Sequence, residues 1–163
     1  MASLTDALVQ QLLNGRYVAS LATQNPDGSI HMVAVWYWFD GANIFVATAS
    51  RSRKAQNMKS SSKATLMIDS RHPQASFGAT IAGAVQILQG GTSQKLNREI
   101  HRKYLSPAAI ADPQVGPVFA GWDDVTVQIT PLSVISWDMR EADAQVFGGS
   151  FKNNPGYLLP LER

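Results

Sequence analysis

The sequence contains no cysteine, which excludes a disulfide framework, a thiolate metal site, an iron–sulfur cluster and a cysteine nucleophile. It has no apolar run near the ~18 residues that a membrane span needs, so we expect no membrane association. Residues 1–15 lack the basic start of a signal peptide, and we expect a cytoplasmic protein. The net charge of +2 is too small to indicate nucleic-acid binding by itself.

Charge is also scarce, because Asp, Glu, Lys and Arg make up 16% of the chain, whereas about 25% is usual for a soluble domain. Hydrophobic residues make up an ordinary 45% of the 163 residues, which predicts one globular domain. Two explanations remain open for the shortage of charge. The surface is rich in uncharged polar side chains, or another subunit covers part of it.

The pattern of short apolar segments and turns predicts a mainly β protein with peripheral helices. A helix is expected at residues 3–14, where Leu4, Leu8 and Leu12 fall on one face. Six strands are expected, joined largely by turn signals such as Asn25-Pro26-Asp27-Gly28. They lie at residues 16–24, 29–39, 44–48, 64–69, 77–88 and 125–137. Because few helices separate the strands, the sequence predicts an antiparallel barrel, with a bulge or close backbone approach at Gly83.

Basic and hydroxyl side chains gather at residues 48–54, where a predicted strand ends and a helix begins. The cations Arg51, Arg53 and Lys54 lie within one turn of Thr48 and Ser52. Free N–H groups at a helix start favour an anion, and Arg and Lys both bind phosphate oxygens. A phosphate cradle is therefore one hypothesis, and a solvated basic helix start is the other. Nucleic-acid binding is a weaker third alternative, because the basic residues do not continue as a stripe.

Residues 31–39 read HMVAVWYWF and are apolar on both faces of an expected strand. Alternation places Met32 and Trp36 on one face and Val33 and Tyr37 on the other. One face would line the barrel interior. The other would meet a subunit or a flat ligand, although an aromatic-rich strand is most often core.

Other chemical signals are weak. The three histidines, His31, His72 and His101, are scattered, and we expect them at the surface or at strand ends rather than on a metal. The neighbours Asp123 and Asp124 would point to opposite faces and make a poor acid/base pair. A phosphate cradle without a protein nucleophile favours a cofactor that carries its own reactivity.

The order of these segments resembles the FMN-binding split-barrel family, the pyridoxamine 5′-phosphate oxidase-like proteins. The resemblance runs from about Arg16 to Trp137. It rests on LAT, NPDG and a long strand at 21–39, on IFVAT followed by SRKAQNM at 44–58, on TLMID and its partner strand containing Gly83, and on FAGWDDVTVQITPLSVISWD at 119–138.

The resemblance implies a six-stranded antiparallel split β-barrel that binds FMN at a homodimer interface. It implies that the strand residues Val33, Ala34, Val35 and Trp36 pass beside the isoalloxazine ring, largely through backbone. It also implies that the FMN phosphate is held by Thr48, Ser52, Arg53 and Lys54, and that Trp137 lies near the flavin. Residues 1–137 would form this domain, and residues 138–163 would be an irregular tail packed on the dimer.

The chain departs from true pyridoxamine phosphate oxidases at several positions. Tyr37 stands where those enzymes carry a lysine for the substrate phosphate, and the family's flavin-contacting glutamine is replaced near Phe77. The C-terminal Arg-x-His substrate motif is absent. We therefore expect no significant oxidation of pyridoxamine phosphate.

The expected function is hydride transfer through FMN to or from a small molecule that the sequence does not identify. The short form resembles a branch of the family in which some members use the deazaflavin F420 and others bind haem. A deazaflavin reductase, or a non-catalytic flavin- or haem-binding protein, therefore remains an alternative. No residue is assigned as a catalytic acid or base.

Overall fold

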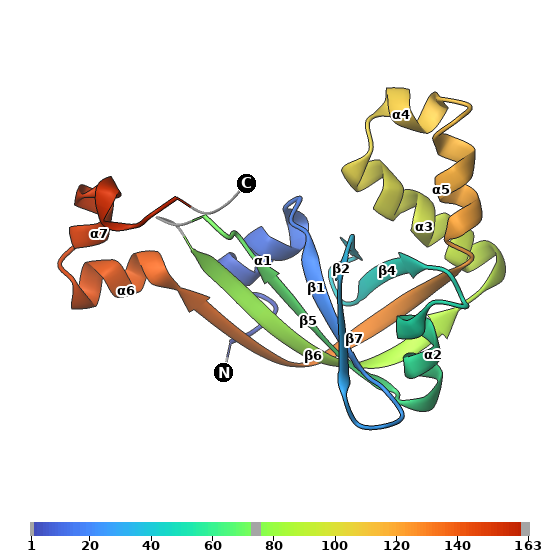
Figure 1. The fold of residues 1–163 in the computed structure, drawn as a ribbon, viewed down its shortest axis with the longest axis horizontal. Helices are drawn as coiled ribbons and strands as arrows, with labels where there is room; N and C mark the ends of the chain where they lie inside the picture. Colours follow the sequence, from blue (N-terminus) through green and yellow to red (C-terminus); the bar gives the residue numbers. More distant parts are fainter. Residues whose placement is uncertain (1, 73–75, 161–163) are drawn as a thin grey trace.

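A computed structural model describes residues 2–72 and 76–160, and its central feature is one strongly curved antiparallel sheet (Figure 1). The strands follow the order β2-β1-β5-β6-β7-β4-β3 across the sheet. Their bounds are β1 Ala19–Gln24, β2 Ile30–Val35, β3 Trp38–Phe39, β4 Ile44–Thr48, β5 Lys63–Asp69, β6 Phe77–Leu88 and β7 Val125–Asp138. The mainly β split-barrel prediction is confirmed.

The sheet has seven strands rather than the predicted six, because the segment expected as one strand at 29–39 is divided. Its first part, β2, pairs with β1 at one edge, and its last part, β3, pairs with β4 at the other edge. The break falls at Trp36 and Tyr37, where the chain crosses from one edge to the other. This crossing brings the two edges together and gives the barrel its split.

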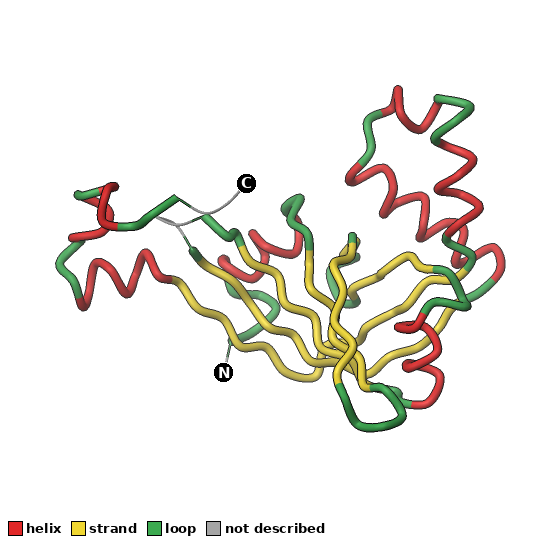
Figure 2. The backbone as a smooth tube through the Cα atoms, viewed as in Figure 1, coloured by secondary structure: helices red, strands yellow, loops and turns green. Residues whose placement is uncertain are grey.

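Seven helices and one 3₁₀ turn surround the sheet in the described part of the chain (Figure 2). Their bounds are α1 Ala7–Asn14, α2 Arg53–Ser60, α3 Gly90–Tyr104, α4 Pro107–Ala111, α5 Gly116–Trp122, α6 Met139–Val146, α7 Ser150–Asn153 and the 3₁₀ turn Pro155–Tyr157. Helices α3, α4 and α5 gather at one end of the molecule, and α6 and α7 lie at the opposite end (Figure 1).

The start of the first helix differs from the prediction. It begins at Ala7 instead of residue 3, because the backbone N–H of Ser3 donates to the Asp6 carboxylate in a turn that precedes it. Gly15 ends that helix in an extended conformation. A side chain at Gly15 would collide with the ring of Tyr17, so close packing explains the glycine.

The segment after residue 138, predicted to be irregular, instead forms α6 and α7. Asp138 caps α6 by accepting from the backbone N–H of Arg140. The buried carboxylate of Asp143 accepts from the backbone N–H groups of Phe151 and Lys152, which holds the two helices together. These polar contacts are local, and they order the segment without burying much apolar surface.

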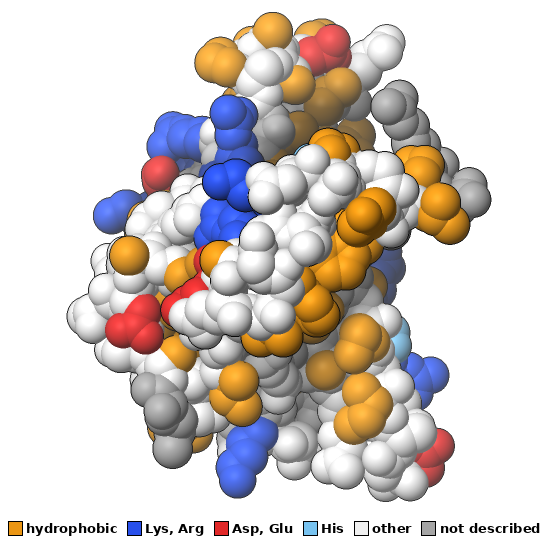
Figure 3. Space-filling model, turned by 90° about the vertical axis from the view of Figure 1, so that its left-hand side faces the viewer, with side chains coloured by type: hydrophobic (Ala, Val, Ile, Leu, Met, Phe, Trp, Pro, Cys, Tyr) orange, Lys and Arg blue, Asp and Glu red, His pale blue; other side chains and the backbone are white. Residues whose placement is uncertain are grey.

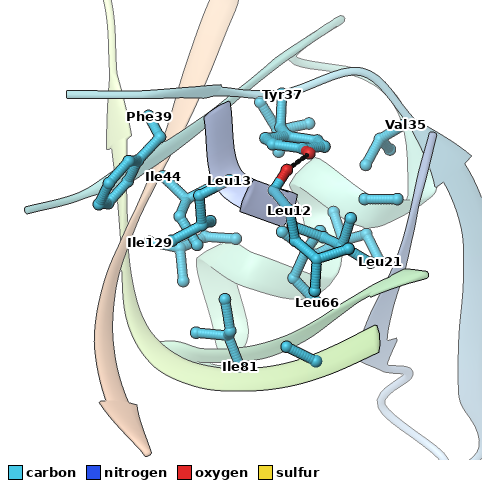
Figure 4. Packing of buried hydrophobic residues seen from close by; sticks show 14 of the residues in the cluster. Leu12, Leu13, Leu21, Val35, Tyr37, Phe39, Ile44, Leu66, Ile81 and Ile129 are labelled. Carbon is cyan, nitrogen blue, oxygen red and sulfur yellow. Dashed lines mark hydrogen bonds between the residues drawn. The ribbon is translucent and has the colours of Figure 1, made fainter. Parts of the chain in front are cut away.

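The core lies between α1 and the concave face of the sheet (Figure 4). Leu12 and Leu13 of α1 are fully buried against strand side chains. The strand residues around them include Leu21, Ile44, Leu66, Ile81 and Ile129. Burying one such side chain contributes roughly 1.5–3 kcal/mol, so the packing of α1 against the sheet accounts for much of the stability of the barrel.

Strands β6 and β7 are the longest in the sheet, and they are irregular at Gly83, as predicted. The register between the two strands shifts between Ala82 and Gly83, and Gly83 pairs with Pro131. A side chain at Gly83 would meet the Ile129 side chain and the Thr130 carbonyl oxygen at 2.6 Å. The glycine therefore allows both the bulge and the close approach of β7.

Candidate functional site

The loop between β4 and α2 brings together the hydroxyl groups of the predicted cradle. Thr48, the last residue of β4, is buried and pairs with Val125 of β7. Its Oγ1 lies 3.0 Å from Oγ of Ser52. Ser52 is the N-cap of α2 and accepts from the backbone N–H of Ala55 at 3.3 Å. The strand end and the helix start are thus joined through two hydroxyl groups.

Three cations surround the first turn of α2, and none of them forms an ion pair within the described residues. Arg51 and Arg53 are exposed, and Lys54 is half-buried. Burial lowers the pKa of Lys54, and the negative charge of nearby Asp123 opposes that shift only in part. The positive end of the helix dipole adds to the same potential. This surface therefore favours an anion.

Asp124 closes the other side of the loop. Its carboxylate accepts from the backbone N–H of Ser50 at 2.6 Å and from the Ser50 hydroxyl at 2.7 Å. These donors, assisted by Arg51, lower the pKa of Asp124. One backbone donor of the loop is thus already used, so an anion would bind to the Thr48 and Ser52 hydroxyl groups, the first N–H groups of α2 and the cations.

The β1–β2 hairpin turn lies next to this cradle. Asn57 of α2 is buried and donates to the hydroxyl of Thr23 at 3.1 Å and to the side-chain carbonyl of Asn25 at 2.9 Å. Arg53 lines a cavity of about 560 Å³ together with Asn25, Pro26, Asp27 and His31. The cradle is therefore open toward the start of β2.

Sequence reasoning did not single out Asn57 or Asn25. No spacing in the sequence distinguishes Asn57 from the exposed polar residues of this helix, although it is buried together with Ala55 and Met58. A buried polar side chain needs partners, and only the fold brings Thr23 and Asn25 to it.

The predicted ring-binding segment, Val33 to Trp36, runs along the edge of the sheet. Within the described part of the chain, β2 pairs only with β1, so its outer backbone groups are not used by the sheet. Val35 is buried, Val33 is half-buried and Ala34 is exposed. An edge strand with free N–H and C=O groups can bind a planar ligand through its backbone.

The side chain of Trp36 is occupied within its own chain. Its ring stacks on Tyr104 of α3 at 5.0 Å and on Phe119 of α5 at 5.6 Å. Tyr37, the next residue, points into the core, where its hydroxyl donates to the carbonyl of Leu12 (Figure 4). Only the backbone of this stretch remains available to a ligand.

Trp137 lies at the far end of β7 from the cradle. Thr48 pairs with Val125 at the start of β7, and Trp137 follows 12 residues later (137 − 125), which corresponds to about 40 Å of strand. The Trp137 ring packs over Gly78, where a side chain would come within 2.2 Å of it. Within one chain, the structure does not bring Trp137 to the other predicted site residues.

Asp123 and Asp124 bind different partners, as predicted, whereas the position predicted for one histidine is wrong. Asp124 points to the cradle loop, and Oδ2 of Asp123 is hydrogen-bonded to Nε2 of His101 at 2.9 Å. His101 is buried on α3, so the prediction of a surface position is wrong for this residue. His31 is half-buried, and His72 is exposed. Among residues 2–72 and 76–160, no His, Asp and Glu side chains form a group that could hold a metal.

No helix of the described chain is both long enough and apolar enough to cross a lipid bilayer.

The comparison with known protein families matches residues 5–131 to the family described as pyridoxamine 5′-phosphate oxidase. The comparison with curated proteins gives no match.

Three solved structures with the same fold have sequences less than 25% identical to this chain. A conserved hypothetical protein, Rv2991 from Mycobacterium tuberculosis, has a TM-score of 0.71 at 23% identity, covering 86% of this chain and 88% of its own. A protein named F420 reductase has a TM-score of 0.62 at 22% identity, covering 77% and 94%. General Stress Protein 26 from Bacillus anthracis has a TM-score of 0.59 at 13% identity, covering 82% and 94%.

Proposed function

The chain belongs to the pyridoxamine 5′-phosphate oxidase family, and from that premise we propose that it is an FMN-dependent oxidoreductase. The observation that carries the proposal is the set of three cations around the first turn of α2 that form no ion pair within the described residues. A phosphate monoester such as that of FMN would bring two negative charges into direct contact with them. Thr48, Ser52, Arg53 and Lys54 would hold it through hydroxyl and charge-assisted hydrogen bonds.

The isoalloxazine ring would lie along the free edge of β2, beside the backbone of Val33 to Trp36. The cavity of about 560 Å³ next to Arg53 is also lined by His31 at the start of this strand. It would connect the proposed phosphate site with the proposed ring site. Bound FMN supplies the hydride chemistry, and the protein supplies orientation and electrostatics. The packing of Trp36 on Tyr104 and Phe119 would keep the strand edge in a fixed position.

The proposed active form is a homodimer. Trp137 lies about 40 Å of strand from the cradle of its own chain, and we propose that it approaches the flavin as Trp137 of the partner subunit. Exposed apolar residues on β2 and β7 support such an interface, namely Ile30, Met32, Leu132 and Ile135. Figure 3, which faces the end that carries α6 and α7, shows a further band of hydrophobic side chains. Burying these surfaces would account for the low charge content of the chain.

Pyridoxamine phosphate is not the proposed substrate. Tyr37 occupies the position of the family's substrate-binding lysine, and it is fully buried with its hydroxyl bonded to α1. A side chain in that state offers nothing to a substrate phosphate. Purified protein supplied with FMN should show no substantial oxidation of pyridoxamine 5′-phosphate, and rapid turnover of it would contradict this assignment.

The cofactor proposal is tested by titrating FMN into the purified protein and into the double variant Arg53→Ala/Lys54→Ala. Loss of two charge-assisted contacts should weaken binding by about 3–6 kcal/mol. The matched control is Lys59→Ala/Lys63→Ala, which removes two exposed lysines, one in the last turn of α2 and one at the start of β5, and its affinity should match the wild type. Equal FMN affinity of the cradle variant and the wild type would remove the phosphate assignment.

F420 is the second candidate cofactor, because the F420 reductase shares the fold over 94% of its own length. The phosphate-linked tail of a deazaflavin would use the same cradle. Parallel titrations with FMN and F420, followed by absorption spectra, separate the two cofactors. Reduction of the bound cofactor by a nicotinamide donor, with transfer to an acceptor, separates an enzyme from a non-catalytic binding protein.

A further inference from the structure

A second cavity lies among α3, α4 and α5, at the end of the molecule opposite α6 and α7 (Figure 1). Its volume is about 300 Å³, which is at the lower limit of small-molecule sites. It is separate from the cradle cavity and shares no lining residue with it. The lining is mostly apolar, and its apolar residues are Leu105, Ile110, Pro117, Phe119 and Ala120.

The polar part of this lining comes from one face of α3 and carries no negative charge. Arg98, His101 and Arg102 lie at positions i, i+3 and i+4, so their side chains are neighbours. Arg102 is paired with Glu99 at 2.8 Å, whereas Arg98 forms no ion pair among residues 2–72 and 76–160. None of the residues that line the cavity is Asp or Glu.

The imidazole of His101 is held in place by contacts with Asp123 and Phe119. Asp123 binds Nε2 of His101 at 2.9 Å, and the ring of Phe119 packs edge-on to the imidazole at 5.5 Å. Asn97, one turn earlier on α3, donates to the carbonyl of Asp123 at 2.8 Å and thereby fixes the residue that binds the histidine. An imidazole anchored in this way has a defined orientation toward the cavity, as a ligand-binding group requires.

The turn between α4 and α5 closes the apolar end. A side chain at Gly116 would lie 2.1 Å from the carbonyl oxygen of Ile110, so the two helices meet there without a gap. Phe119 and Ile110 then form an apolar wall that faces the basic groups of α3. One side of the cavity is thus suited to an apolar body, and the other to an anionic group.

We propose that the α3–α5 cavity is a binding site for a small organic carboxylate with an apolar body, its carboxylate bound by Arg98 and Arg102 beside His101. An aryl- or alkyl-substituted carboxylate of roughly ten non-hydrogen atoms matches the volume. An uncharged analogue would leave Arg98 without an anionic partner, whereas Arg102 keeps its ion pair with Glu99. A cationic analogue would be repelled by the two arginines.

The test uses 3-phenylpropanoate as the probe, with 3-phenylpropanamide and 3-phenylpropylamine as isosteric controls, on the full wild-type chain. Calorimetric titration should show saturable binding of the acid and roughly tenfold weaker binding of the amide. The indole N–H signals of Trp36 and Trp122, whose rings contact Phe119, should shift, whereas that of Trp137 should not. Equal binding of acid and amide, no saturable binding of the acid, or shifts confined to Trp137 would overturn the proposal.

The variant Arg98→Gln/Arg102→Gln should lose roughly tenfold in affinity for the acid. The control Lys95→Gln, an exposed position on α3 outside the lining, should retain wild-type affinity. If the double variant does not fold, the comparison of acid with amide on the wild type decides the question. The cradle variant Arg53→Ala/Lys54→Ala should bind the acid normally, so failure of this proposal and failure of the FMN proposal are distinguishable.

Discussion

The half-buried lysines Lys54 and Lys103 have the same side chain in different surroundings. Burial lowers the pKa of both, that of Lys103 to about 8. Lys103 donates to the carbonyl of Leu13 at 3.0 Å, close to the C-terminal end of α1, and lies 3.9 Å from the centre of the Tyr37 ring. Lys54 lies in the first turn of α2 and has no hydrogen bond or ion pair in the described structure.

The difference shows how a structural cation can be distinguished from a binding one. Lys103 is near the negative end of a helix dipole and an aromatic face, both of which stabilise a positive charge. Lys54 is near the positive end of a helix dipole, which destabilises one. Lys103 uses its ammonium group within its own chain, whereas Lys54 forms no hydrogen bond or ion pair among the described residues and is available to a ligand. For this reason Lys54 belongs to the proposed phosphate site and Lys103 does not.

Among single substitutions, the largest expected effect is on cofactor binding by Lys54→Met. Loss of one charge-assisted contact should weaken FMN binding by about 1.5–3 kcal/mol. Its free energy of unfolding without FMN should be unchanged or slightly higher, because a half-buried charge without a hydrogen bond among the described residues is removed. Fluorescence titration and urea denaturation measure the two quantities. A Lys54→Met variant that lost stability and kept its FMN affinity would show that Lys54 is the structural lysine instead of the binding one.

Tyr37→Phe should have the next largest effect, on stability alone. The buried hydroxyl donates to the carbonyl of Leu12, and its removal leaves that carbonyl without this donor. The free energy of unfolding should fall by about 1–3 kcal/mol, measured by urea denaturation. FMN affinity should stay at the wild-type value. A large loss of affinity in a stable variant would place Tyr37 in the binding site instead of the core.

Lys103→Met should lower the free energy of unfolding by about 1 kcal/mol at neutral pH. The variant loses the hydrogen bond to Leu13 and the contact with the Tyr37 ring, partly offset by relief from burying an ammonium group. Lys95→Met on the exposed face of the same helix is the control, and it should change stability by less than about 0.5 kcal/mol. Equal effects of the two substitutions would show that the Lys103 contacts contribute nothing.

A pH dependence is also expected. The pKa of Lys103 is about 8 in the folded chain, below its ordinary value of 10.5, so between these values the unfolded chain holds the extra proton. Stability from this group therefore rises as the pH increases from about 8 toward 10. Urea denaturation at several pH values should show this rise in the wild type relative to Lys103→Met. A constant difference between the two proteins across this window would contradict the lowered pKa.

Much of the fold was predictable because its signals are local. The turn at residues 25–28, the bulge at Gly83 and the strand at 44–48 follow from residue types and alternation within a few positions. The cradle was also visible, because Thr48 to Lys54 are adjacent in the chain and a strand–helix junction needs no distant contact. Val33, Val35, Tyr37 and Phe39 share the inward face, as their alternation indicated.

Two of the errors share one physical cause, which is long-range packing. The division of residues 29–39 into β2 and β3 depends on both edges of the sheet meeting at Trp36 and Tyr37. His101 is buried because Asp123, 22 residues away, is positioned at the start of β7 to bind it. No local pattern marks either event.

The sequence by itself determined the absence of thiols, a loop rich in basic and hydroxyl side chains, an antiparallel barrel and an apolar strand. These properties depend on residue identity and on spacing of a few positions. Only the tertiary structure decided that Lys103 is hydrogen-bonded within its own chain while Lys54 is not among the described residues, which side of Trp36 its own chain covers, and that Trp137 lies far along β7 from the cradle of the same chain. Such outcomes depend on which distant groups meet, and that is decided when the sheet curves around α1 and brings its two edges together.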